Sequence, residues 1–430
     1  MREMKDSGVE WIGEIPKDWD TKRIKAVLCE RNETNSPVKT NFILSLTNDR
    51  GIIPYTEKGD VGNKSKDDLT GYKLAYEGDI VLNSMNVIIG SVALSSYYGC
   101  VSPVYYMLYT RNQQDSIKYY NYLFQTKELQ NRLKGYGNGI MEIRMRIQMS
   151  KLNTVEFPIA PSDIQHRIAE YLDRKCYKID EIIEKESQVI EKLKAYKQSV
   201  ITEAVTKGLN PDVPMKDSGV EWVGLIPKGW FLVKLKYCTY IRARLGWKGL
   251  KADEYTENGY PLLSAFNIVN NKLDFSDLNF INKERYDESP EIKLALNDVL
   301  LVKDGAGIGK CGVVTELPYE TTVNGSIAVV TSNSILNGTF LYYYFLTNMF
   351  QKFIDRVKGG MGVPHLFQSD LKEISIPLPN SREQQIIADY LEKKCTQIDS
   401  AIDKKQATIE KLTAYKKSLI YEVVTGKKEV

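Results

Sequence analysis

A glycine-rich segment in the second half of the chain is the closest approach to a ligand-binding motif. Gly307 to Gly312 fits the pattern G-x-G-x-x-G and follows a predicted strand. A dinucleotide-binding fold needs a helix next, because the helix N-terminus meets the phosphates. Here Val313 to Thr315 and then Pro318 predict a strand and a turn. We therefore expect a tight glycine turn between two strands, not a nucleotide site.

Asp298 and Lys303 resemble part of a nuclease site in which carboxylates and a lysine cooperate. Metal-dependent cleavage needs at least two convergent carboxylates to hold the ion. Leu301, two residues before the lysine, is not acidic, and the counterpart of Lys303 in the first half of the chain is Ser84. There is also no Walker loop, no Gly-x-Ser-x-Gly elbow and no Asn-Pro-Pro-aromatic motif. The sequence thus predicts no catalysis and no cofactor in this chain.

Cysteine and histidine usage points the same way. The chain has six cysteines, none of them in a CxxC pair, and only two histidines, His166 and His365. A Cys/His metal centre would need more ligands at closer spacing. We expect buried free thiols in a reducing compartment.

Basic and polar residues instead gather near predicted turns in both halves. Arg and Lys near loops suit contact with DNA phosphates, and Asn, Gln and Arg can read base edges. One such residue is more often a solvated surface charge, so the group carries the prediction. The basic candidates for DNA contact are Lys64, Lys66, Arg144, Arg146, Arg242, Arg244, Lys248, Lys303, Lys310 and Lys358. The net charge of +3 requires that such contacts come from local patches.

These turns must be held by a frame, and the frame is a long charged helix that occurs twice. The segment from Ile168 to Leu172 returns at 387–391, an offset of 219 residues. Each copy begins with a predicted capping box, Ser162 with Gln165 and Ser381 with Gln384. Glycines at 208 and 426 are placed to end the two helices. The first copy has neither Pro nor Gly between its ends, which predicts a spacer of roughly 65 Å at 1.5 Å per residue.

Apolar residues along both helices follow a heptad pattern with two polar interruptions. One interruption is Lys197, repeated as Lys416, and the other is Glu186, which becomes Lys405 in the second copy. Equivalent positions of an antiparallel pair meet only at its middle. We therefore expect antiparallel helices with Glu186 close to Lys405, where opposite charges would fix the register. The alternative is that both are solvated charges on a locally frayed seam.

The opening of the chain is repeated as well. Met4 to Trp11 recurs without change at 215–222, an offset of 211 residues, so the second copy carries eight additional residues before its helix. The regions between each opening and each helix combine predicted strands with aromatic-rich helices, at 119–134 and 341–358, yet differ almost completely in sequence. The pattern indicates an α+β protein of two mixed domains with pseudo-twofold, circular organisation. We predict domains at 1–161 and 211–380, and spacer helices at 162–210 and 381–430.

This combination resembles the specificity subunit of type I restriction-modification systems. The resemblance covers essentially the whole chain. It is carried by the Ser-Gly-Val-Glu-Trp opening at 7–19, its copy at 218–230, and the Gln-x-x-Ile-Ala-x-Tyr-Leu helices beginning at Gln165 and Gln384. One departure is Ala160-Pro161-Ser162-Asp163, where the family often has Pro-Pro-Leu-x-Glu-Gln.

The resemblance implies two target recognition domains that each read half of a split site in double-stranded DNA. It implies that the antiparallel helices set the spacing and dock two methyltransferase subunits, which use S-adenosylmethionine. Two restriction subunits that need Mg and ATP are optional further partners. By position in the family's fold, it adds Gly137, Asn138, Gly360, Met361, Gly362 and His365 to the predicted DNA contacts.

A competing interpretation is a non-catalytic coiled-coil scaffold whose two domains bind protein or glycan. DNA binding should weaken steeply with salt, whereas binding through apolar patches should not. The sequence has no run of about 18 apolar residues for a membrane span and no apolar leader at its start. We expect a cytoplasmic protein.

Overall fold

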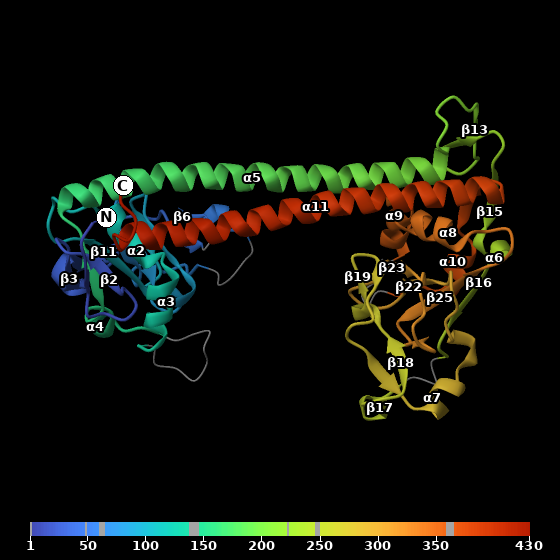
Figure 1. The fold of residues 1–430 in the computed structure, drawn as a ribbon, viewed down its shortest axis with the longest axis horizontal. Coiled ribbons are helices and arrows are strands. Elements are labelled where there is room, and N and C mark those ends of the chain that lie inside the picture. The colour runs from blue at the N-terminus through green and yellow to red at the C-terminus, as the bar shows by residue number, and fades with distance from the viewer. Residues whose placement is uncertain are drawn as a thin grey trace. The chain divides into compact units, whose positions relative to one another are not determined.

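The computed structural model describes residues 2–47, 50–59, 65–136, 146–221, 223–245, 250–357 and 365–430. The chain divides into two compact units (Figure 1). Unit 1 combines Met1–Ser187 with Gln406–Val430, and unit 2 is the segment Gln188–Lys405. Each unit contains mixed helices and strands, which confirms the predicted α+β class.

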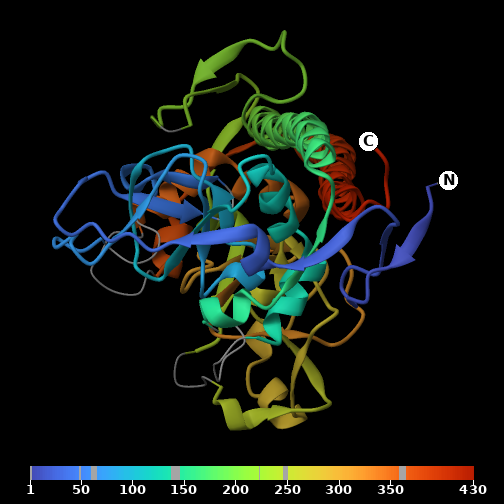
Figure 2. The same cartoon turned by 90° about the vertical axis from the view of Figure 1, so that its left-hand side faces the viewer.

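Two long helices belong to both units. Helix α5 spans Ser162–Lys207 and helix α11 spans Ser381–Val424. In unit 1, Leu172 and Cys176 near the start of α5 share a core with Leu419 and Val423 near the end of α11. In unit 2, Ile201 and other residues near the end of α5 share a core with Ile387 and Leu391 near the start of α11. The helices are therefore antiparallel, as predicted, and they lie side by side in both views (Figures 1 and 2).

The lysines that interrupt the heptad pattern pair with aspartates across the seam. In unit 1, Nζ of Lys416 lies 2.6 Å from a carboxylate oxygen of Asp180. In unit 2, Nζ of Lys197 lies 2.7 Å from Asp399. The two pairs are equivalent under the 219-residue repeat. Because all four side chains keep contact with solvent, each pair is worth at most about 1 kcal/mol, and its main effect is on register.

The start of each long helix differs from the predicted capping box. The glutamines at 165 and 384 are buried and do not reach back to the helix cap. Gln165 instead accepts a hydrogen bond from the Ser116 N–H at 3.1 Å and donates to the Ala160 carbonyl at 2.9 Å. Gln384 likewise accepts from the Asn337 N–H at 2.7 Å. Burial explains why these glutamines bind the loop backbone and not the helix cap. Polar groups that water cannot reach must find hydrogen-bond partners within the protein.

The helix ends agree with the prediction from glycine. Gly208 follows α5 with a φ of +78°, and Gly426 lies two residues beyond α11 with a φ of +73°. These are left-handed conformations that glycine adopts without strain. A Cβ at Gly426 would lie 2.4 Å from Cδ of Pro16, whereas a Cβ at Gly208 would lie 3.3 Å from the ring of Trp230. The repeated opening segment thus packs against a helix end in each unit.

We expect Gly426→Ala to destabilise unit 1 by about 2–3 kcal/mol, since left-handed strain adds to a steric overlap with a rigid proline. Gly208→Ala is the matched control and should cost less, about 1 kcal/mol in unit 2, because its Cβ would meet the Trp230 ring at 3.3 Å instead of overlapping a proline. Thermal unfolding monitored by hydrogen exchange of each unit measures both effects. Equal losses for the two variants would contradict the packing at Pro16.

Unit 1 is built on a four-stranded antiparallel sheet in the order β4-β11-β8-β9. Its strands are Leu28–Arg31, Tyr105–Thr110, Ile80–Asn83 and Val92–Leu94. Four antiparallel pairs accompany it: β1 (Met4–Asp6) with β2 (Glu14–Pro16), β3 (Asp20–Arg23) with β12 (Glu156–Ile159), β5 (Leu44–Thr47) with β6 (Gly51–Pro54), and β7 (Lys73–Ala75) with β10 (Gly99–Val101). The helices are α1 (Ile24–Val27), α2 (Ile117–Phe124), α3 (Lys127–Lys134) and α4 (Met149–Leu152).

Unit 2 repeats this sheet as β16-β25-β22-β23. Its strands are Thr239–Ala243, Ile327–Ser332, Val299–Val302 and Cys311–Val313. A second sheet has the order β17-β21-β18-β24, with strands Tyr255–Thr256, Asn279–Ile281, Tyr260–Leu263 and Thr322–Val323. The other strand pairs among the described residues of unit 2 are β13 (Met215–Asp217) with β14 (Leu225–Pro227), β15 (Phe231–Lys234) with β26 (Ser375–Leu378), and β19 (Ile268–Val269) with β20 (Lys272–Leu273). The helices are α6 (Leu235–Cys238), α7 (Lys283–Asp287), α8 (Gly338–Phe345), α9 (Asn348–Val357) and α10 (Gln368–Lys372).

Residues 303–310, which include Gly307 and Gly309, form a turn between strands β22 and β23, as predicted for the glycine-rich segment. The Val302 N–H donates to the Lys310 carbonyl at 2.8 Å, and the Gly309 N–H donates back to the Val302 carbonyl at 2.9 Å. Gly309 has a φ of +90°. Strand β23 follows directly, so the segment does not lead into a helix that could receive phosphate.

Each predicted aromatic-rich helix is in fact two helices, α2 with α3 and α8 with α9. A buried threonine stands at each break. The hydroxyl of Thr126 donates to the Leu123 carbonyl at 2.7 Å, and the hydroxyl of Thr347 donates to the Tyr344 carbonyl at 2.8 Å. These hydroxyls take backbone carbonyls that a continuous helix would use, and so they end the first helix of each pair.

Candidate nucleic-acid interface

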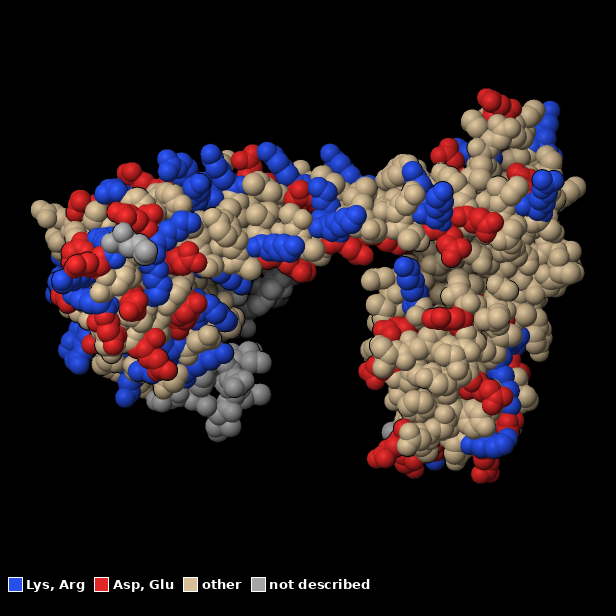
Figure 3. Space-filling view, viewed as in Figure 1, with Lys and Arg blue, Asp and Glu red and all other residues tan. Residues whose placement is uncertain are grey.

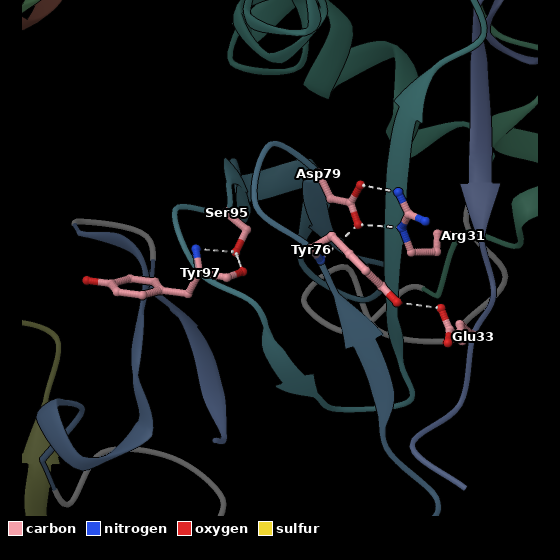
Figure 4. Close-up of polar contacts among 6 residues, drawn as sticks. All are labelled: Arg31, Glu33, Tyr76, Asp79, Ser95 and Tyr97. Atoms are coloured by element: carbon pink, nitrogen blue, oxygen red, sulfur yellow. Dashed lines mark hydrogen bonds and ion pairs between the residues drawn. The ribbon is translucent and has the colours of Figure 1, made fainter. Parts of the chain in front are cut away.

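A pair formed by the partly exposed Arg31 and the buried Asp79 anchors the central sheet of unit 1 (Figure 4). Arg31 at the end of β4 binds Asp79 through two hydrogen bonds, at 2.9 and 3.2 Å. The same carboxylate accepts from the Tyr76 N–H at 3.0 Å, which closes the turn before β8. The hydrogen bond to Asp79 raises the pKa of Arg31. The Arg31 guanidinium also lies over the rings of Tyr76 and Tyr109, at 4.2 and 4.8 Å from their centroids.

Unit 2 contains the equivalent pair, Arg242 with Asp298. Nη2 of Arg242 lies 3.0 Å from Oδ2 of the fully buried Asp298, which also accepts from the Ala295 N–H at 2.8 Å. The hydroxyl of Thr331 joins the two side chains. Arg242 was predicted to contact DNA, but these partners occupy its guanidinium. The structure favours a role in holding strands β16, β22 and β25 together.

Aromatic side chains form an exposed surface beside the Arg31 pair, and the sequence did not single them out. The Tyr76 hydroxyl donates to Glu33 at 3.0 Å, and hydrogen bonds from Lys39 and Tyr76 lower the pKa of that carboxyl. Ser95 donates to the Tyr97 carbonyl at 2.8 Å, and the Tyr97 ring points away from Arg31 (Figure 4). The ring of Phe42 meets that of Tyr97 edge to face at 5.9 Å.

Three of the predicted residues in unit 2 come together around one cavity. Arg244, Lys303 and His365 line a space of about 320 Å³. Lys303 pairs with Asp304 at 2.6 Å, and the His365 ring also contacts that carboxylate. Arg244 is buried and donates to the Ser289 hydroxyl at 3.2 Å, and burial lowers its pKa. Its Nε and Nη2 have no hydrogen-bond partner among the described residues. Cations with spare donors suit an anionic ligand.

The corresponding place in unit 1 has the same backbone but different side chains. The Leu366 N–H donates to the Lys303 carbonyl at 2.9 Å, and the Ile147 N–H donates to the Ser84 carbonyl at 2.9 Å. His365 therefore corresponds to Arg146, which is exposed, and Lys303 corresponds to Ser84. One frame presents two different sets of side chains.

The other predicted site residues are spread more widely. Lys310 is exposed on the β22–β23 turn, and Lys66 is exposed in unit 1, where its N–H donates to the Tyr72 hydroxyl at 3.2 Å. Glu186 and Lys405 fall in different units, so their pairing remains a prediction. The predicted residues outside the described part of the chain are Lys64, Gly137, Asn138, Arg144, Lys248, Lys358, Gly360, Met361 and Gly362.

The distribution of charge and the cysteines do not point to a further site. On the face drawn in Figure 3, basic and acidic side chains are interspersed along the long helices. All six cysteines are free thiols, and burial raises the pKa of Cys238 and of Cys395 to about 11. Within the described residues, no group of three or more His, Cys, Asp or Glu side chains is placed to hold a metal ion. Nor do those residues include a helix apolar enough over sufficient length to cross a membrane.

The fold and these clusters define a duplicated protein that presents two different polar surfaces from one repeated frame. Comparison with known proteins identifies the family. The model of the type I restriction modification DNA specificity domain matches residues 16–192 and 242–412, and the chain belongs to this family. It is therefore a DNA-specificity subunit with no catalysis of its own.

Relatives and solved structures agree over nearly the full length. The MjaVIII specificity subunit of Methanocaldococcus jannaschii is 24% identical over 96% of this chain and 93% of its own. The putative MjaX specificity subunit of the same organism is 25% identical over 97% and 95%. A chain from a type I restriction-modification system has a similar fold, with a TM-score of 0.74 at 14% identity, covering 96% of this chain and 99% of its own. The HsdS subunit from Thermoanaerobacter tengcongensis gives 0.53 at 16% identity, covering 96% and 98%.

Proposed function

We propose that unit 1 and unit 2 each read one half of a split site in double-stranded DNA, while α5 and α11 set the distance between the halves. The observation that carries this proposal is the repeated frame with different contents. The Arg–Asp pair, the buried glutamine and the helix-end glycine recur in both units. The exposed or cavity-lining residues at equivalent places, such as His365 and Arg146, do not. Two similar readers with different side chains suit two different half-sites.

The same proposal assigns the chemistry to partner subunits. The paired helices would dock two methyltransferase subunits that use S-adenosylmethionine, and two restriction subunits that need Mg and ATP could join them. The complex would act in the cytoplasm, where its DNA lies and where the free thiols of this chain would stay reduced. Half-sites read from one face of the duplex would lie about one helical turn apart, on the order of 34 Å.

Co-expression with the methyltransferase encoded beside this chain, followed by mapping of methylated adenines, tests the proposal. The expected result is a split motif with a gap of fixed length. Replacing residues 20–148 with those of a relative should change only one half of the motif, because the long helices and unit 2 remain intact. A swap that changes both halves would contradict independent reading by the two units.

Salt dependence distinguishes DNA reading from a scaffold that binds protein or glycan. We expect the affinity for the motif to fall steeply with ionic strength, as phosphate contacts release counterions. A soluble, methyltransferase-bound chain that neither directs methylation nor binds DNA in a salt-dependent way would support the scaffold.

A further inference from the structure

Phe266 is the most exposed large apolar side chain of the described residues, with 92% of its surface accessible. It lies in a single helical turn, Ala265–Asn267, that directly follows Ser264 at the end of strand β18. Single exposed apolar residues are common on protein surfaces. Phe266 is distinguished by how firmly its turn is held and by what lies next to it.

The turn is fixed by a network centred on a buried amide. Oδ1 of Asn267 accepts from the Ser264 N–H at 2.9 Å, and Oγ of Ser264 accepts from the Phe266 N–H at 3.3 Å. The Asn267 side chain in turn donates to the Asp277 carbonyl at 2.8 Å. Moving the Phe266 ring into the core would break these bonds and leave buried polar groups unpaired, which is costly. The ring is therefore held outward before any ligand arrives.

Basic side chains flank this turn. A Cβ added at Gly307 would lie 3.7 Å from Cβ of Ala265 and 3.6 Å from Cδ of Lys310. The turn that carries Phe266 thus packs against the β22–β23 turn that carries the exposed Lys310. Lys303, which lines the cavity with Arg244 and His365, immediately follows strand β22. An outward aromatic ring beside cations suits a ligand with both stacked bases and phosphates.

Unit 1 has a different residue at the equivalent place. Ile43-Leu44-Ser45 corresponds to Leu262-Leu263-Ser264 at the 219-residue offset, so Thr47 occupies the position of Phe266. Thr47 is half-buried, and its hydroxyl donates to the Gly51 carbonyl at 3.0 Å. Thr47 is the last residue of strand β5, whereas Phe266 lies in a helical turn, so the two units differ here in both side chain and local backbone.

We propose that Phe266 is a base-contacting residue of unit 2 that inserts its ring at a base step of the DNA half-site, with Lys310 on the adjoining phosphate. Apolar wedges of this kind partly unstack a base step. The inference rests on the proposed function, because it takes double-stranded DNA as the ligand of unit 2.

The test uses the full chain in complex with its methyltransferase and a duplex carrying the mapped motif. A 2-aminopurine base is placed at successive positions of the half-site that unit 2 reads, because its fluorescence rises when it unstacks. Apart from the adenine that the methyltransferase itself flips out of the stack, the wild-type complex should raise the fluorescence at one step. Phe266→Ala should abolish that rise and weaken binding on the order of tenfold to a hundredfold, with an unchanged salt slope. Lys310→Ala should reduce the slope by about one.

Phe231→Ala is the matched control, since Phe231 is 70% exposed but lies on strand β15. It should bind DNA like wild type. Both phenylalanine variants should keep the wild-type melting temperature, because neither ring is packed in the core. If Phe266→Ala matches wild type in affinity and fluorescence while wild type still prefers the motif to a scrambled duplex, the inference is wrong and the proposed function stands. If wild type shows no such preference, the proposed function itself fails.

Discussion

Replacing Asp298 with alanine is expected to lower the free energy of unfolding of unit 2 by about 3–5 kcal/mol. The change leaves the guanidinium of Arg242 largely buried without its carboxylate, and it also removes the acceptor for the Ala295 N–H. Because the chain has two units, a single unfolding transition is not assumed. Hydrogen exchange at strands β16 and β22, compared with strands β4 and β8 of unit 1, measures the loss in the correct unit.

Asp287→Ala provides the control for this first prediction. Asp287 pairs with Lys283 and Lys293 on the surface of the same unit, at 2.5 and 2.6 Å, and its loss should change the stability of unit 2 far less, because solvent screens these exposed pairs. A double variant, Arg242→Met with Asp298→Leu, should recover part of the stability, since it removes both charges together. Similar losses of stability for Asp298→Ala and Asp287→Ala would show that the buried pair contributes no more to the free energy of unfolding than an exposed pair does.

The second large effect is expected on the helix seam. Leu391 of α11 is fully buried in the core of unit 2, together with Ile201 and Ala204 of α5. Leu391→Ala should cost about 2–5 kcal/mol, because it removes buried methyl groups and leaves a cavity between helices. Ile386→Ala on the same helix is the control, since Ile386 is 51% exposed and should cost under about 1 kcal/mol.

Urea unfolding followed by hydrogen exchange of unit 2 measures both variants. Leu172→Ala should have the same effect on unit 1, where Leu172 occupies the equivalent seam position and is equally buried. A Leu391→Ala variant that destabilised unit 1 and spared unit 2 would contradict the assignment of this seam to its own unit.

The frame could be predicted from sequence because its signals are local or repeated. A run without Pro or Gly and a heptad of apolar residues predicted α5 and α11, and glycines 208 and 426 marked where they end. The glycine-rich segment 307–312 was predicted to be a tight turn between strands because strand-forming residues follow it. Each of these inferences needs only neighbouring residues and the physical preferences of the backbone.

The features that could not be predicted from the sequence depend on partners far away in the chain. Gln165 looked like a capping residue, yet its amide binds the backbone at Ser116, 49 positions earlier. Arg242 was predicted to contact DNA, and that stays a prediction, but its binding to Asp298 and Thr331 was not foreseen. Phe266 could not be distinguished from a core phenylalanine, because exposure is a property of the folded chain. The repeat could have predicted the Arg242–Asp298 pair, since Arg31 and Asp79 recur as Arg242 and Asp298 at offsets of 211 and 219.

The division of the chain has a consequence for synthesis on the ribosome. Unit 2 is one continuous segment, whereas unit 1 needs Gln406–Val430 to fill the seam against α5. The Tyr119 hydroxyl, for example, lies 3.0 Å from the Val424 carbonyl, within hydrogen-bond distance across 305 positions of sequence. The unit that begins translation first must therefore finish folding last, after unit 2 has emerged. A premature stop codon just before Gln406 would leave unit 2 complete, whereas unit 1 would lack the segment of α11 that covers its core.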